Sequence, residues 1–298
     1  YYENAKINRV YVDRVHVKKA FAEYTAAYNA DDPKIKLKID HTYRVAALCE
    51  RIAKAAGMCA YDVELAWLSG MLHDVGRFEQ IKRYNTFSDA DSVDHAKFGA
   101  DLLFKDGLIS TFLKGMVKCT GYKPGALEDR YDSDGVFLYD RLNKSDMEML
   151  ELSIRCHNMY RIPQGLNRRE QAFCNVLRDA DKVDIFKVNI DTPLEEIYNT
   201  TTEELMKSDI TDEVLKAFDE EHCILKAIRR TPADTVIGHV SLAYELVYDE
   251  SVRITVEQGY LAKLMHFHSD NEETNRKMAM VREKMDSYVK KRIGKKDV

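Results

Sequence analysis

Proline and glycine are scarce in this chain. Its 298 residues include 5 Pro and 13 Gly, too few for an all-β protein, which needs a turn after each short strand. No run of apolar residues is long enough to span a membrane. We therefore expect a helical protein without a membrane partner.

The chain also lacks an excess of basic residues and any Cys-x-x-Cys pair. Its 45 Lys and Arg against 50 Asp and Glu give a net charge of −5, which argues against a dedicated nucleic-acid-binding protein. Small phosphorylated ligands stay compatible with this charge, because metals and a few cations can supply local positive charge. The six cysteines are typical of reduced core residues in a cytoplasmic protein.

Amphipathic patterns predict helices over most of the chain. The predicted helices span residues 10–28, 35–56, 61–74, 91–104, 144–159, 168–188, 233–248 and 271–293. We expect loops at 77–90 and 119–143, the second of which is either a mobile flap near the functional site or a surface excursion. Within it, residues 136–139 fit a short strand or a packing anchor. The strand signal is poor elsewhere, so the predicted fold class is all-α.

The most informative feature is the adjacent pair His73 and Asp74, which ends an apolar helical run. The pair offers a nitrogen and an oxygen ligand, and the two oxygens of Asp74 can bridge two metals. Further polar residues stand among apolar neighbours in helical segments. Four buried imidazoles near two carboxylates need partners, and a metal is the simplest one. These other residues are His41, His95, His157 and Asp181.

The ordered set resembles the HD superfamily of metal-dependent phosphohydrolases. The pattern is a His, then His-Asp, then two further His and a distal Asp, and the local sequences Leu-His-Asp-Val-Gly-Arg and Asp-Ala-Asp-Lys-Val-Asp match as well. The resemblance covers about residues 35 to 190. It implies an HD-domain helical bundle at 30–190. Helical patterns continue outside this range, so we also expect a C-terminal helical extension at 191–298 packed on the bundle and an N-terminal helix at 1–29 in the same body.

The resemblance also implies a ligand set for two divalent metals. One metal belongs to His41, His73, Asp74 and Asp181, and the other to His95, His157 and the second oxygen of Asp74. Ligands of this kind without Cys suit Mn²⁺, Fe²⁺, Co²⁺, Ni²⁺ or Zn²⁺ alike. Asp179 and Asp184 flank Asp181 and are its rivals, or could hydrogen-bond the ligands.

The chemistry implied is hydrolysis of a small phosphorylated substrate such as a nucleotide. Metals lower the pKa of bound water and neutralise phosphate oxygens. We expect Asp74 to be central to catalysis and both Arg77 and Lys182 to contact the phosphate. A solvated cation or an ion pair explains either basic residue equally well.

Two other functions fit the same ligands. A minority branch of the superfamily uses a very similar set to hold two irons that activate O₂. A sensor that binds a nucleotide without catalysis is the second alternative, although retention of all six ligands argues against a degenerate site.

Overall fold

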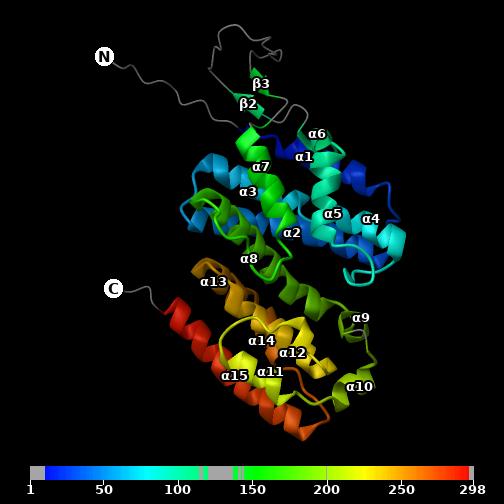
Figure 1. Cartoon of the computed structure of the whole chain (residues 1–298), viewed down its shortest axis with the longest axis vertical. Helices are drawn as coiled ribbons and strands as arrows, with labels where there is room; N and C mark the ends of the chain where they lie inside the picture. Colours follow the sequence, from blue (N-terminus) through cyan, green and yellow to red (C-terminus); the bar gives the residue numbers. More distant parts are fainter. Residues whose placement is uncertain are drawn as a thin grey trace. The chain divides into compact units, whose positions relative to one another are not determined.

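Helices form nearly all of the regular structure (Figure 1). The structure is a computed structural model that describes residues 11–113, 117–119, 137–139, 142, 144–198 and 200–294. The all-α prediction is confirmed. Among the described residues, no helix is both long and apolar enough to cross a membrane.

The chain forms two compact units, residues 1–177 and 178–298. They divide inside one long helix, α8 (Arg168–Asp191). The domain boundary at residue 190 that we expected from the sequence stays a prediction. The packing of the C-terminal extension on the HD-domain bundle also stays a prediction.

Helices of the first unit bury apolar faces against one another. α2 begins where Asp32 caps its first turn and Pro33 occupies its first position, an arrangement that favours helix initiation. Its buried face carries Val45, Cys49 and Ile52 and packs on α3. The helices are α1 (Arg14–Thr25), α2 (Pro33–Ala55), α3 (Ala60–Leu72), α4 (Val75–Tyr84), α5 (His95–Ala100), the π-helical turn η1 (Asp101–Lys105), α6 (Ile109–Leu113) and α7 (Lys144–Arg155).

Two glycines allow the helices that carry the candidate ligands to approach one another closely. A Cβ on Gly70 of α3 would lie 2.6 Å from the Cα of Ala46 on α2. A Cβ on Gly76 of α4 would lie 2.5 Å from the carbonyl oxygen of His95 on α5. Only glycine permits either contact, so these two positions bring α2, α3, α4 and α5 together around the junction between α3 and α4.

The predicted loop at 77–90 is wrong in its first half. Residues 77–84 continue α4, because Val75, Phe78 and Ile81 recur at helical spacing and are buried. The helix ends at Asn85, which adopts a left-handed backbone conformation with φ of 52°. The actual loop is therefore 85–94, and α5 starts after it with Asp94 as its N-cap.

A small antiparallel sheet accompanies the first unit. It has the order β1 (Tyr11–Val12), β2 (Val117–Cys119) and β3 (Phe137–Tyr139), with Val12 opposite Val117 and Lys118 opposite Leu138. Of the two possibilities for 136–139, the structure shows the strand. Most of the predicted flap at 119–143 lies outside the described residues.

The second unit is a cluster of helices with a core of its own. Asp179 on α8 ties this unit together, because its buried carboxylate accepts hydrogen bonds from the backbone N–H groups of Val247 and Tyr248 and from the Ser251 hydroxyl. The elements are α9 (Leu194–Tyr198), α10 (Thr202–Lys207), α11 (Asp212–Asp219), η2 (Lys226–Ile228), α12 (Pro232–Val240), η3 (Ser241–Glu245), α13 (Asp249–Gln258), α14 (Tyr260–Met265) and α15 (Glu272–Ile293). The core includes Phe186, Leu205, Ile210, Val214, Phe218, Ile237 and Met278.

Candidate metal centre

Asp74 stands at the break between α3 and α4. His73 ends the first helix and Asp74 precedes the second, so their side chains leave the backbone where two helices meet rather than along one helix face. Asp74 is only 2% exposed. A carboxylate buried this deeply needs positive partners to stay ionised.

The two oxygens of Asp74 face two different pairs of histidines. Oδ2 lies 3.5 Å from Nε2 of His41 and 3.5 Å from Nε2 of His73. Oδ1 lies 3.6 Å from Nε2 of His95 and 3.7 Å from Nε2 of His157. One carboxylate thus stands between two imidazole pairs that come from α2, the end of α3, the start of α5 and the turn after α7.

Hydrogen bonds on the far side of the rings determine which nitrogen points inward. Nδ1 of His73 donates to the carbonyl of Gly70 at 2.7 Å, and Nδ1 of His157 donates to the carbonyl of Ile154 at 2.7 Å. A carbonyl oxygen can only accept, so these Nδ1 atoms carry the protons. In the neutral rings, the Nε2 atoms therefore present lone pairs toward Asp74.

His95 has the same orientation but a stronger anchor. Its Nδ1 lies 2.6 Å from Oδ2 of Asp89. Burial would raise the pKa of Asp89, but the hydrogen bond from His95 holds that pKa below its usual value, so the carboxylate is ionised and accepts. Burial, with the nearby charge of Arg77, lowers the pKa of His95 to about 4, which leaves the ring neutral at pH 7.

The inward Nε2 atoms approach one another in pairs. Nε2 of His41 and Nε2 of His73 lie 3.3 Å apart, and those of His95 and His157 lie 3.1 Å apart. Two nitrogen ligands at right angles, each about 2.1 Å from one metal, would be separated by about 3 Å. Oδ1 of Asp74 is buried and makes no hydrogen bond within the described part of the chain. The donor set therefore fits a divalent metal at each pair.

Five of the six predicted ligands are brought together in this way. The groups that could each hold an ion are His41, His73 and Asp74, and then Asp74, His95 and His157. Asp181 lies on α8 in the second unit, and its role as a ligand stays a prediction. Its rival Asp179 is engaged by the backbone at the start of α13, and Asp184 is buried.

The basic residues near the centre differ from one another. Arg77 uses one nitrogen, Nη1, to donate to Gln80, to the carbonyl of Phe87 and to Asp89, so it holds the 85–94 loop. Its Nε lies 3.8 Å from Oδ1 of Asp74. Lys182 is on α8 in the second unit, where burial and the neighbouring Arg178 lower its pKa.

Sequence reasoning missed two residues of the centre. Lys38 donates to Oδ2 of Asp74 at 2.7 Å, and it lies three residues before His41 on α2, a spacing that places both on one helix face. Burial would raise the pKa of Asp74, but Lys38 and then His73 hold it well below its usual range. Asp89 was hidden in a segment predicted only as loop, and no sequence signal pairs it with His95.

Comparison with known proteins gives one match. The family model of the HD domain matches residues 39–185, a segment that includes all six predicted ligands. No curated protein and no solved structure matches the chain. HD domains form a superfamily of metal-dependent phosphohydrolases. Together with the histidine and aspartate groups around Asp74, the match shows that the chain belongs to the HD-domain superfamily.

Proposed function

We propose that this protein hydrolyses a phosphoester of a small phosphorylated molecule, such as a nucleotide, with two divalent metals at the Asp74 centre. The observation that carries the proposal is the position of Asp74, each of whose oxygens faces a pair of inward Nε2 atoms. A bridging carboxylate between two nitrogen pairs is suited to a two-metal site.

The donor set supports a borderline metal. His41 and His73 would hold one ion with Oδ2, and His95 and His157 the other with Oδ1. We propose Asp181 as a further ligand of the first ion. Imidazole nitrogen with carboxylate oxygen and no thiolate suits Mn²⁺, Fe²⁺, Co²⁺, Ni²⁺ or Zn²⁺. When bound, such ions supply an activated water and neutralise phosphate oxygens.

The protein's own residues would orient these ligands and the substrate. The carbonyls of Gly70 and Ile154 fix His73 and His157 with Nε2 inward, which keeps the ligand rings from rotating. Arg77 is close to Oδ1 of Asp74 and has donors left for a phosphate, because its Nε makes no hydrogen bond in the described chain. We propose Lys182 as the second phosphate contact.

Metal analysis followed by a phosphate-release assay tests the proposal. Protein purified without chelator is analysed for bound metal and then screened against a panel of phosphorylated metabolites. We expect phosphate or nucleoside release from at least one phosphoester, and its loss in His73→Ala. His268→Ala is the matched control, because His268 is exposed in the second unit and should leave both metal and activity unchanged.

The same samples separate the other two functions. Oxygen uptake by iron-loaded protein, with no release from any phosphoester, would replace hydrolysis with an oxygenase reaction. If neither phosphoester hydrolysis nor oxygen uptake is detected and the protein still binds a nucleotide, the result would instead favour a nucleotide-binding sensor without catalysis.

Neutralising either proposed phosphate contact should weaken catalysis less than losing a metal ligand. For Arg77→Gln and for Lys182→Gln we expect kcat/KM to fall by the equivalent of about 1–3 kcal/mol, the value of a charge-assisted hydrogen bond. Metal content of Lys182→Gln should equal that of the wild type. A variant with unchanged kcat/KM on the best substrate would remove that residue from the phosphate site.

A further inference from the structure

The two halves of the Asp74 centre differ in the cation that each carboxylate oxygen already holds. On one side, the Lys38 ammonium donates to Oδ2 at 2.7 Å with a side chain that is 14% exposed. On the other side, Oδ1 accepts no hydrogen bond from the described residues, and Arg77 approaches it only to 3.8 Å. The half with His41 and His73 therefore contains an ammonium that is hydrogen-bonded to its carboxylate oxygen. The half with His95 and His157 has only the more distant guanidinium of Arg77, which also pairs with Asp89.

The Lys38 ammonium and a metal would compete for the same oxygen. An ion held by His41 and His73 needs an electron pair of Oδ2 and adds two positive charges beside the ammonium. Two like charges a few ångströms apart in a site shielded from water repel each other far more than they do at a surface. One hydrogen bond does not offset repulsion of that size.

An alternative position for the Lys38 ammonium exists beside an aromatic ring. Its Nζ already lies 5.4 Å from the centre of the Phe87 ring, within the range in which an aromatic face attracts an ammonium. The lysine stem is flexible, so a small rotation can move the charge off Oδ2 and leave it beside the ring.

We propose that Lys38 is an internal counter-cation of Asp74, which the metal bound by His41 and His73 must displace. Lys38 thereby lowers the metal affinity of this half, so that the half with His95 and His157 fills first. When no metal is bound, Lys38 compensates the charge of the buried carboxylate. The inference rests on the proposed function only in that both need metal at these residues.

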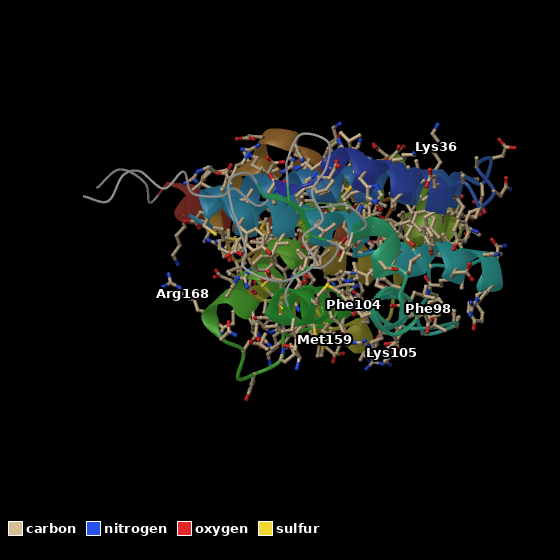
Figure 2. The ribbon with its side chains drawn as sticks, turned by 90° about the horizontal axis from the view of Figure 1, so that it is seen from above. Lys36, Phe98, Phe104, Lys105, Met159 and Arg168 are labelled. Atoms are coloured by element: carbon tan, nitrogen blue, oxygen red, sulfur yellow. The ribbon has the colours of Figure 1, made fainter. Side chains whose placement is uncertain are left out.

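Charge removal at Lys38 gives the main test. Chelator-treated, full-length protein is titrated with Mn²⁺ and separately with Zn²⁺ against a fluorescent chelator, for wild type, Lys38→Met, Lys38→Arg and Lys36→Met. Lys38→Met should tighten the weaker of two binding steps by roughly tenfold or more, because a nearby like charge is lost, whereas Lys38→Arg should stay near wild type. Lys36 is the matched control, since it is exposed on the same helix and points away from it (Figure 2).

Single-half backgrounds show where the change occurs. In His95→Ala, where only the half with His41 and His73 remains complete, Lys38→Met should keep its full effect. In His41→Ala the effect should vanish, because the remaining half contains no ammonium. Equal effects in both backgrounds would overturn the assignment of Lys38 to one half.

Thermal unfolding provides a readout that does not depend on activity. Without metal, Lys38→Met should unfold at a lower temperature than wild type, because Asp74 loses its counter-charge. Saturating metal should then raise its unfolding temperature by more than it raises that of the wild type. If Lys38→Met does not fold, Lys38→Gln, which keeps a donor for Oδ2 without the charge, should give the same tightening.

Opposite results overturn the proposal. Weaker metal binding in Lys38→Met and Lys38→Gln would mean that Lys38 orients the carboxylate for the metal instead of competing with it. Unchanged affinity would mean that the ammonium never opposes the ion. Either result leaves the proposed function standing, whereas a folded wild type that binds no metal at all would overturn both.

Discussion

Histidines with a shielded ring nitrogen occur in both units of this protein, but in opposite surroundings. In the first unit, four rings surround one carboxylate, with Nδ1 of His73, His95 and His157 held from behind. In the second unit, the His239 ring lies beside Tyr198 with ring centres 5.5 Å apart, and its shielded Nδ1 makes no hydrogen bond among the described residues. Its charged neighbours are cations, Arg229 and Lys226.

This difference separates the candidate metal ligands from a histidine that packs beside an aromatic ring. A shielded ring nitrogen is common to both, so it predicts nothing about metal. A ligand needs a proton acceptor behind the ring, which turns the other nitrogen inward, and an anion in front of it, which compensates the metal charge. His239 has neither, and the cations around it would repel an ion.

Removing Asp74 should have the largest effect, because it is shared by both halves of the centre. Asp74→Ala should lose most of the bound metal and all phosphoester hydrolysis, as measured by elemental analysis and by the release assay. His239→Ala is the comparison and should keep its metal. Wild-type metal stoichiometry in Asp74→Ala would contradict the whole assignment.

Removing one histidine from the half with His95 and His157 should reduce the bound metal by one ion. We expect His95→Ala and His157→Ala each to bind about one metal fewer than wild type, because His41, His73 and Asp74 still hold the other. Elemental analysis after metal saturation and gel filtration gives the count. If the wild type itself binds a single ion and neither substitution changes that number, the centre is mononuclear and these histidines have another role.

A smaller loss is expected when the support behind His95 is weakened. Asp89→Asn keeps the shape of the side chain but removes the charge that accepts from Nδ1 of His95. Metal affinity of that half should fall about 10–100-fold, the usual cost of such an outer contact, while the half with His41 and His73 stays as it was. Asp91 is an exposed neighbour in the same loop, so Asp91→Asn should leave the metal affinity of both halves unchanged.

The grouping of the histidines around Asp74 could be predicted from sequence because these residues lie in or beside helices. His41, His95 and His157 stand in or beside segments whose apolar periodicity shows which face is buried. Asp89 could not be predicted, because it depends on how the 85–94 loop folds over Arg77 and Gln80. Periodicity carries no information about such side-chain bonds.

The same limit explains the other differences. The π-helical turn at 101–105 overlaps the end of the helix that we predicted at 91–104. The end of α12 at Val240, followed by the 3₁₀ turn η3, lies inside the helix that we predicted at 233–248. Both turns keep the spacing of buried apolar residues close to that of an α-helix but change the backbone hydrogen-bond pattern. The hydrophobic pattern of the sequence therefore does not reveal them. Lys38 was overlooked for a different reason: a lysine on a ligand face looks like a solvated residue until its partner is known.

The last expected effect concerns His239 and appears only in acid. Burial, aided by the charges of Arg229 and Lys226, lowers the pKa of His239 to about 3, against about 6.5 in an unfolded chain. Protonation therefore favours unfolding: the stability that the neutral ring provides is complete above pH 6.5 and is lost as the pH falls from 6.5 toward 3. The loss is at most about 1.4 kcal/mol for each pH unit in that range.

His239→Phe removes this titration while keeping a ring of similar size. The free energy of unfolding of the variant should therefore fall less than that of wild type between pH 7 and pH 4, as measured by urea unfolding of chelator-treated protein. Protons that bind the histidines around Asp74 affect both proteins alike, so the difference isolates His239. If wild type and variant lose stability in parallel as the pH falls, His239 is not held neutral in the folded protein. If His239→Phe changes the metal content, His239 contributes to metal binding, and the contrast between the histidines of the two units is wrong.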